Sequence, residues 1–377
     1  MAMKSNENFD ACRSRKDEKG TDFCRRKTRQ IWIGTVPVGG GSPISVQSMT
    51  KTDTRLHKKT IDQVNKLEAL GCEIVRLAVP DAEAAGALKE IKNQTGIPLV
   101  ADVHFDHRLA LAALEQGVDG LRINPGNIGS KRKIQQVVAA AKERSVPIRI
   151  GVNAGSLEKD LLRQFGGASP EAMVESALRH VHILEDMSFN LIKVSLKASD
   201  VQRTVRAYRM MAEKVDYPFH VGITEAGSLL SGAVKSAAGI ALLIHDGLVD
   251  TLRVSLTAPP EEEVRVAYAI LSSLGIRARG PNFITCPTCG RCEVDLMTIA
   301  AEVEKRLASV KENITIAIMG CMVNGPGEAK EADIGLACGK GVGVIFKKGE
   351  LLRRLDKKEI IPEFVAEVRA LLKERRS

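Results

Sequence analysis

Between residues 44 and 257 the chain repeats one pattern eight times, and this repeat limits the possible fold more than any other feature. Each unit has a short apolar run that ends in polar residues, and amphipathic stretches with helical spacing follow. The eight runs span residues 44–49, 73–79, 98–104, 120–126, 147–153, 191–197, 219–224 and 251–257. Strands that alternate with helices predict a parallel sheet. Eight such units close a (β/α)8 TIM barrel, which is the fold we expect here.

An open, doubly wound sheet is the alternative fold for the same repeat. Such sheets prefer a Gly-rich phosphate-binding loop after their first strand, and no such loop follows residues 44–49. The segment GGGS at 39–42 precedes this run instead. We interpret GGGS as a hairpin turn, with residues 30–38 as the first arm of the hairpin.

Charged and polar residues recur inside or at the ends of the eight apolar runs. Active sites of (β/α)8 barrels lie at the C-terminal ends of the strands, so we expect these side chains to meet at one mouth. They are Arg76, Asp102, His104, Arg122, Asn124, Asn127, Arg149, Asn153, Lys193, Ser195, Lys197, His220, Thr224, Glu225, Arg253 and Ser255. For any single member of this set, a structural ion pair or a solvated rim position explains the pattern equally well.

The cations of this set outnumber its acids. The acids are Asp102 and Glu225, and the cations are Arg76, Arg122, Arg149, Lys193, Lys197 and Arg253. Burying so many cations without partners would be costly, and the planar fork of arginine suits phosphate oxygens. We therefore expect the mouth to bind a small molecule that carries a phosphate or diphosphate group.

The net charge of the 377-residue chain is +9, which favours acidic ligands or partners. A basic metal-binding protein for nucleic acid would interleave aromatic and basic residues or carry a recognition helix. Aromatic residues make up only 3% of the chain, so we expect no nucleic-acid partner. No apolar run is long enough to span a membrane, and the polar residues 1–24 predict a disordered tail instead of a signal peptide. We expect a cytoplasmic protein with no membrane contact.

A Gly- and Pro-punctuated stretch at 274–283 ends the repeat, and a different order of elements follows it. The later pattern predicts a helix at 293–309, strands at 313–320 and 341–349, and a helix at 361–375. This order indicates a small α+β domain. The expected organisation is a tail at 1–24, a substrate-binding barrel at 25–274, a linker at 275–284 and a second, cysteine-bearing domain at 285–377.

The segment ITCPTCGRCEVDL at 284–296 places Cys286, Cys289 and Cys292 two residues apart, and Cys321 follows a predicted strand further on. In a reducing compartment, clustered cysteines indicate metal binding or catalysis more often than disulfides. A structural zinc site on a barrel transferase is one interpretation, but zinc ribbons usually show a second CxxC pair. A close run with one distant cysteine favours an iron–sulfur cluster.

The residue pattern alone is consistent with two different fourth ligands for such a cluster. Cys286, Cys289, Cys292 and Cys321 would make an all-thiolate set suited to electron transfer. Alternatively, a tight turn at Pro326–Gly327 would return Glu328 toward Cys321 as a displaceable ligand. Glu328 is equally explained as an exposed acid, and Cys338 has no assigned role.

Several motifs resemble one known family. They are RQIWIGTVPVGGGSPISVQSMTKTDT, LVADVHF, LRINPGNIG, IRIGVNAGSLE, IKVSLKAS, HVGITEAG, LRVSLT, CPTCGR and MGCMVNGPGEAKEADIG. In this order, over roughly residues 25–350, they are similar to the 4-hydroxy-3-methylbut-2-enyl diphosphate synthase family of the non-mevalonate isoprenoid pathway. The combination of the barrel motifs with CPTC and NGPGE is highly specific.

The resemblance implies a reaction and its partners. The reaction is the two-electron reductive ring opening of 2-C-methyl-D-erythritol 2,4-cyclodiphosphate to the linear allylic diphosphate and water. Flavodoxin or ferredoxin supplies the electrons, and these carriers are acidic, which suits a basic chain. Family members are homodimers in which the cluster domain of one subunit covers the barrel mouth of the other.

The resemblance also implies roles for matching positions. Cys286, Cys289, Cys321 and Glu328 match the ligands of a [4Fe–4S] cluster, and Glu225 matches the acid near the substrate. Arg122, Arg149, Lys193 and Arg253, with Asn153 and Ser255, match positions that hold the diphosphate. Arg76, Asp102 and His104 match other positions at the mouth. The family pattern needs no cysteine at 292, so we expect Cys292 to be a spare thiol near the cluster.

Overall fold

The computed structural model of the chain describes residues 25–124, 128, 130–322, 327, 331–356 and 359–376. The predicted tail at 1–24, Asn127 of the expected mouth and Glu328 of the expected ligand set lie outside these residues. The chain divides into two compact units, the first ending at Ile270 and the second beginning at Leu271.

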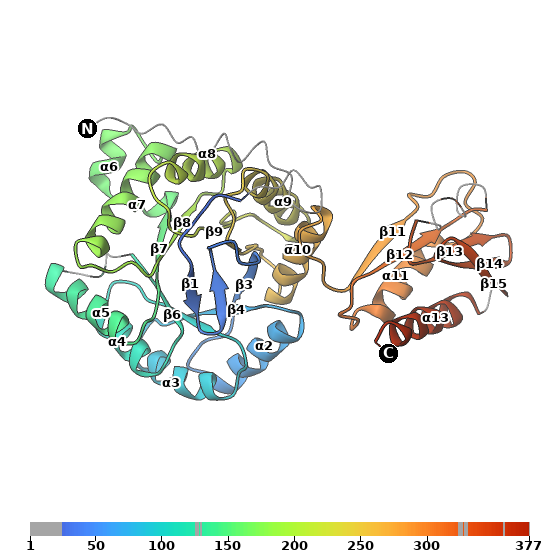
Figure 1. Cartoon of the computed structure of the whole chain (residues 1–377), viewed down its shortest axis with the longest axis horizontal. Helices are drawn as coiled ribbons and strands as arrows, with labels where there is room; N and C mark the ends of the chain where they lie inside the picture. Colours follow the sequence, from blue (N-terminus) through green and yellow to red (C-terminus); the bar gives the residue numbers. More distant parts are fainter. Residues whose placement is uncertain are drawn as a thin grey trace. The chain divides into compact units, whose positions relative to one another are not determined.

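The first unit is a closed ring of parallel strands surrounded by helices (Figure 1). Its strands are β3 (Ser45–Met49), β4 (Ile74–Ala78), β5 (Leu99–Asp102), β6 (Gly120–Ile123), β7 (Ile148–Asn153), β8 (Ile192–Lys197), β9 (His220–Val221) and β10 (Thr251–Leu252). They pair in the order β8-β7-β6-β5-β4-β3-β10-β9. A parallel bridge between Val194 and Phe219 joins β8 to β9 and closes the ring. The predicted (β/α)8 barrel is confirmed, and the open sheet is excluded.

Several helices of this unit begin at an Asp or Ser side chain that caps them, and the longer helices bury an apolar stripe. The helices are α2 (His57–Ala69), α3 (Ala82–Asn93), α4 (His107–Glu115), α5 (Lys131–Glu143), α6 (Lys159–Gln164), α7 (Pro170–Glu185), α8 (Val201–Ala212), α9 (Leu229–His245) and α10 (Pro260–Ser273), with a short 3-10 turn at Ala154–Ser156. The side chains of Asp81 and Ser169 accept backbone N–H groups in the first turns of α3 and α7. In α2, Ile61, Val64 and Leu67 face the core.

A hairpin of β1 (Ile31–Ile33) and β2 (Val36–Val38) precedes the barrel. Its turn lies at Gly34 and Thr35, so the prediction of a hairpin turn at GGGS was wrong. Gly34 adopts φ +56°, the left-handed conformation that this tight turn needs. The run of glycines at 39–41 gave a stronger turn signal than the isolated Gly34, and it forms the connection to β3 instead.

The inner face of the hairpin packs against the N-terminal ends of the barrel strands. Ile31, Ile33 and Val38 form a buried apolar core with Ile74, the first residue of β4, and with Val100 of β5. The end of the barrel opposite to its mouth is therefore closed by apolar side chains.

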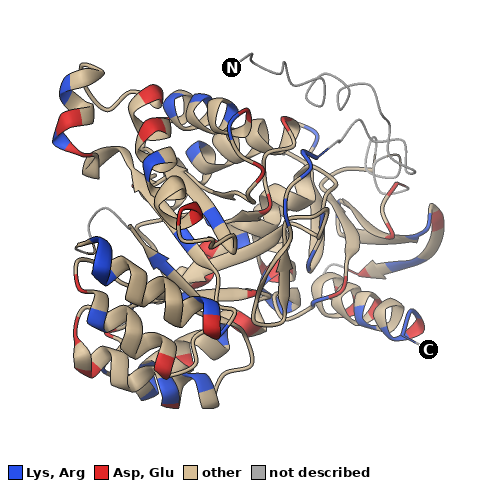
Figure 2. Cartoon of the chain, turned by 60° about the vertical axis from the view of Figure 1, so that its left-hand side comes forward, with Lys and Arg blue, Asp and Glu red and all other residues tan. Residues whose placement is uncertain are grey.

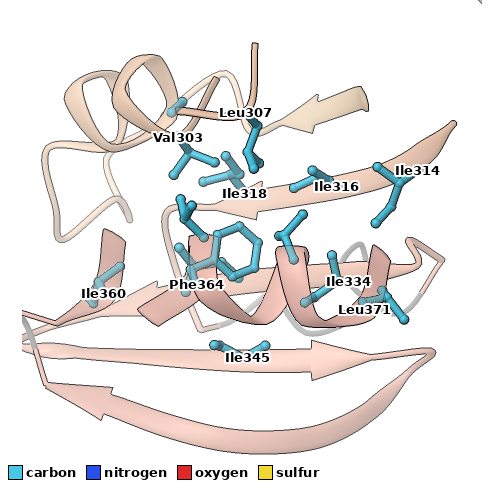
Figure 3. Packing of buried hydrophobic residues seen from close by; sticks show 14 of the residues in the cluster. Val303, Leu307, Ile314, Ile316, Ile318, Ile334, Ile345, Ile360, Phe364 and Leu371 are labelled. Carbon is cyan, nitrogen blue, oxygen red and sulfur yellow. The ribbon is translucent and has the colours of Figure 1, made fainter. Parts of the chain in front are cut away.

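The second unit contains a mixed sheet with two helices. Its elements are β11 (Pro281–Thr285), α11 (Leu296–Leu307), β12 (Ile314–Met319), β13 (Ile334–Gly339), β14 (Val342–Lys347), β15 (Glu350–Asp356) and α13 (Ile360–Glu374). The strands follow in the order β11-β12-β13-β14-β15, parallel as far as β13 and antiparallel after it. Figure 3 shows Phe364 and Leu371 of α13 and Val303 of α11 packed on isoleucines of the sheet.

Three strands of this sheet were not expected from the sequence. The first residues of β11 fall within the stretch expected to be a linker. The run IGLACG of β13 follows a Gly- and Pro-rich loop, and its two glycines weaken the strand signal. Charged side chains on the largely exposed strand β15 hide its alternation. In the part of the chain that the structure describes, no helix is both long and apolar enough to cross a membrane.

Candidate functional site

A row of four charged residues runs around the inside of the barrel. The register pairs Asp102 of β5 with Arg122 of β6, Arg122 with Arg149 of β7, and Arg149 with Lys193 of β8. Paired residues project to the same side of a sheet, and all four are buried. Their side chains therefore share the barrel interior, and Figure 2 shows cations on the strands as well as on the surface helices.

Asp102 is the acid that holds this row together. Its Oδ1 accepts a hydrogen bond from Nη1 of Arg122 at 3.1 Å, and its Oδ2 lies 3.6 Å from Nε of Arg76. His104 lies 3.4 Å from the same carboxylate. Burial alone would raise the pKa of Asp102, but the positive charges of Arg76 and Arg122 hold it well below its ordinary value. Asp102 is therefore ionised and orients its cationic neighbours.

The Arg122 side chain lies against a glycine of the neighbouring strand β7. Its Nη2 donates to the carbonyl oxygen of Gly151 at 3.4 Å. A Cβ at position 151 would lie only 2.7 Å from Nε of Arg122. The absence of a side chain at Gly151 therefore makes the observed position of Arg122 possible.

Arg149 and Lys193 carry buried charge without partners. Nε and Nη1 of Arg149 and Nζ of Lys193 have no hydrogen-bond partner among the residues that the structure describes. Burial, together with the charges of Arg76 and Arg122, lowers the pKa of Arg149 well below its ordinary value. The pKa of Lys193 is lowered in the same way, by burial and by Arg149. An anion bound between these two groups would supply the missing acceptors and remove the repulsion.

Arg76 and Arg253 meet at a methionine sulfur. Nη2 of Arg76 lies 2.9 Å from Sδ of Met49, and Nη1 of Arg253 lies 3.6 Å from the same atom. Burial lowers the pKa of Arg76 to about 10, although the charge of Asp102 opposes this shift. Glu263 pairs with Arg253 at 3.2 Å. Sequence reasoning missed Met49 and Glu263, because neither stands out in the polar pattern of the strands.

His220 is the most deeply buried ionisable residue of the predicted mouth. Its Nδ1 lies 2.6 Å from Oγ1 of Thr251, and its Nε2 has no partner among the described residues. Burial and the charges of Lys197 and Arg149 hold the pKa of His220 well below its ordinary value. His220 is therefore neutral, and it adds no further positive charge to the barrel interior.

The remaining predicted residues lie at strand ends but outside the network around Asp102. Asn153 ends β7 and pairs in register with Lys197, and Ser255 follows β10. Glu225 follows β9, is exposed and adopts φ +50°, a conformation that non-glycine residues rarely occupy. Among the described residues, no side-chain hydrogen bond or ion pair joins Glu225 to the charged row.

The cysteines gather at one edge of the sheet in the second unit. Cys286 directly follows β11, and its N–H donates to the carbonyl oxygen of Ile318 at 3.2 Å. Cys321 follows β12, which runs parallel to β11, so both cysteines leave the sheet at the same edge. Cys289 is exposed in the loop that follows β11. None of these three cysteines forms a disulfide with another described residue.

The thiol of Cys292 is engaged in local contacts within the second unit. It donates to the carbonyl oxygen of Val294 at 3.3 Å. It packs on Gly320, where a Cβ would lie 2.5 Å from Sγ of Cys292. Cys338 is fully buried in the core of this unit, and burial raises the pKa of its thiol to about 12.

The donors in this region fit a metal in their chemistry. Within the described ranges, no three His, Cys, Asp or Glu side chains converge closely enough to hold an ion. Loops at one sheet edge nevertheless carry three cysteines outside disulfides, Cys286, Cys289 and Cys321. Thiolates are the donors that iron–sulfur clusters and zinc prefer. The predicted fourth ligand, Glu328, belongs to the stretch outside the described residues.

Comparisons with known proteins match both units. The family model described as the GcpE TIM-barrel domain matches residues 28–268, and the GcpE protein C-terminal domain matches residues 282–370. The chain is 58% identical over 351 residues to 4-hydroxy-3-methylbut-2-en-1-yl diphosphate synthase (flavodoxin) of Geobacter sulfurreducens, covering 93% of this chain and 99% of that protein. It is 54% identical over 344 residues to the protein of the same name from Clostridium acetobutylicum, covering 91% of this chain and 99% of that protein.

Proposed function

Because the chain belongs to the GcpE family, we infer that it is a 4-hydroxy-3-methylbut-2-en-1-yl diphosphate synthase. It opens the ring of 2-C-methyl-D-erythritol 2,4-cyclodiphosphate by two-electron reduction. Ring opening frees a phosphate oxygen from carbon, and a hydroxyl group leaves as water. The chain is thus an oxidoreductase of isoprenoid precursor biosynthesis.

The observation that carries this proposal is the buried pair of cations Arg149 and Lys193. Their unpartnered N–H groups and mutual repulsion call for an anion with several acceptor oxygens. A cyclic diphosphate has this chemistry. Its phosphate oxygens can accept from neighbouring cations of the row at the same time, and its small ring needs no large apolar pocket.

The other mouth residues complete the binding site. Arg122, Arg149, Lys193 and Arg253 bind the diphosphate, with Asn153 and Ser255 as hydrogen-bonding partners. Asp102 stays ionised and keeps Arg76 and Arg122 oriented. His104, beside the same carboxylate, lies at the exposed side of the network, where substrate enters.

Glu225 supplies the proton with which the hydroxyl group leaves as water. Its positive φ supports this role, because strained backbone positions concentrate at active sites. Its exposure after β9 leaves the carboxyl group available to a molecule that enters the mouth.

We propose that Cys286, Cys289, Cys321 and Glu328 hold a [4Fe–4S] cluster. Such a cluster would supply the two electrons of the reaction one at a time. Cys292 remains a spare thiol, which its hydrogen bond to Val294 supports. The location of Cys286 and Cys321 at the same edge of the sheet, with Cys289 in the loop after Cys286, supports the rest of the ligand set.

We further propose flavodoxin as the electron donor, since the names of the relatives contain it, with ferredoxin as the alternative. These carriers are acidic, and the net charge of +9 favours docking them. We also propose a cytoplasmic homodimer, with a tail at 1–24, a barrel at 25–274, a linker at 275–284 and a cluster domain at 285–377.

Anaerobic purification followed by turnover tests the proposed function. We expect a brown protein with about four iron and four sulfide per chain, as a [4Fe–4S] cluster requires. With reduced flavodoxin and the cyclic diphosphate, phosphorus NMR should show the linear diphosphate. A colourless, zinc-containing protein that leaves the substrate intact would rule this function out and favour a transferase with a structural zinc site.

A further inference from the structure

Glu263 is a buried carboxylate that neither the sequence motifs nor the predicted mouth includes. It is the third of three successive glutamates in the first turn of α10. Glu261 and Glu262 are partly exposed, whereas the Glu263 side chain is only 1% exposed. Burying a carboxylate is costly unless charges and hydrogen bonds compensate it, so its partners indicate what it does.

Four groups surround this carboxylate. Oε2 accepts from Oγ of Ser48 at 3.1 Å and from Nε of Arg253 at 3.2 Å. Oε1 accepts from the backbone N–H of Leu256 at 3.2 Å and lies 3.2 Å from Nζ of Lys51. Ser48 lies near the end of β3 and Lys51 follows this strand. Arg253 and Leu256 follow β10, the neighbour of β3 in the ring. The carboxylate therefore ties together two strand ends at the mouth.

The orientation of Arg253 depends on this carboxylate. Nη2 of Arg253 also faces Glu263, at 3.4 Å, so the acid faces one edge of the guanidinium group. Nη1 rests near Sδ of Met49, which Arg76 also contacts. Arg76 and Arg253 carry like charges and share one sulfur, so repulsion would drive them apart without a nearby anion. A guanidinium group has five N–H donors, and those beyond the edge held by Glu263 remain for an anion in the mouth.

We propose that Glu263 is a positioning residue, whose negative charge fixes Arg253 against the repulsion of Arg76 and aims it at the diphosphate of the substrate. This inference rests on the proposed function, because it takes a diphosphate as the ligand of Arg253. Glu263 does not touch the substrate, and it acts through Arg253.

A double-mutant cycle on the full-length protein tests this role. Glu263→Gln keeps the shape of the side chain and removes its charge. By titration calorimetry, we expect it to weaken binding of inorganic pyrophosphate and of the cyclic diphosphate roughly tenfold, which corresponds to about one charge-assisted hydrogen bond. In an Arg253→Ala background the same substitution should change affinity little, because the two residues act as a unit. KM should rise while kcat changes much less.

Glu261→Gln is the matched control, since it removes the same charge from the same helical turn at a partly exposed position. It should leave both affinities unchanged. If Glu263→Gln does not fold, Glu263→Asp is used in the same double-mutant cycle. This substitution keeps the charge but shortens the side chain, and so withdraws the carboxylate from Arg253.

Two outcomes separate this inference from the proposed function. If the wild-type protein fails to bind the cyclic diphosphate, the proposed function is wrong and the positioning role falls with it. If the wild type binds but the variant binds equally well, or loses the same factor with and without Arg253, Glu263 is only a structural tie and the positioning role alone is refuted.

Discussion

At the scale of single residues, Gly151 decides where Arg122 can lie. A Cβ at this position would lie 2.7 Å from Nε of Arg122, and a guanidinium group pinned to Asp102 has little freedom to yield. We expect Gly151→Ala to displace Arg122 and to raise KM for the cyclic diphosphate by about tenfold, equivalent to one misplaced charged contact. Steady-state kinetics with reduced flavodoxin measure this change.

Gly155→Ala is the control for this substitution. Gly155 lies four residues further on, and a Cβ there would meet nothing within 4 Å. Its kinetic constants should match those of the wild type. Equal KM values for the two variants would show that Arg122 tolerates displacement and does not hold the diphosphate in this position.

The residue scale also shows what the sequence can reveal of the site. The sequence could reveal Arg122, Arg149 and Lys193, because cations inside apolar runs are conspicuous and the parallel register brings them into one row inside the barrel. It could not reveal Glu263, because this residue lies among other glutamates at the start of an amphipathic helix, where acids are common. Only the structure distinguishes the one acid of the three that turns inward.

At the scale of elements, the β1–β2 hairpin closes the barrel by burying one face. Ile33 is 1% exposed and packs in the core with Ile74 and Val100. We expect Ile33→Ala to lower the free energy of unfolding by about 2–5 kcal/mol, through lost burial and the cavity left behind. Urea denaturation followed by circular dichroism measures the loss, and KM should stay unchanged because the hairpin lies opposite to the mouth.

Trp32→Ala provides the comparison within the same strand. Trp32 points to the other side of β1 and is 53% exposed. Despite its size, its removal should cost much less than the removal of Ile33. If the two variants lose similar stability, the hairpin does not seal the barrel through its inner face.

The sequence predicted those strands and helices whose apolar pattern is clear and uninterrupted. The eight barrel strands are buried on both faces and read as apolar runs, so all were found, with ends shifted by a few residues. β11, β13 and β15 were missed, because glycine, proline or exposed charge interrupts their patterns. The hairpin turn was misplaced, because a triple glycine outweighed the single Gly34 that makes the turn.

At the scale of the whole molecule, the proposed chemistry needs two parts that lie in different units. In this proposal the cations of the barrel would bind the diphosphate, and the thiols of the second unit would hold the electron-delivering cluster. Family resemblance implies that the two parts of one active site come from different subunits of a homodimer. This arrangement predicts that two inactive chains can repair each other.

Arg149→Gln should inactivate the barrel and leave the thiols intact, and Cys286→Ser should remove a cluster ligand and leave the barrel intact. Each variant alone should be inactive. Co-expressed in equal amounts, they should recover about a quarter of wild-type turnover, because half of the dimers are mixed and one of two sites in each combines intact parts. Two affinity tags isolate the mixed dimers, in which about half of the activity should return. A mixed dimer with no activity would show that each active site is built within a single chain.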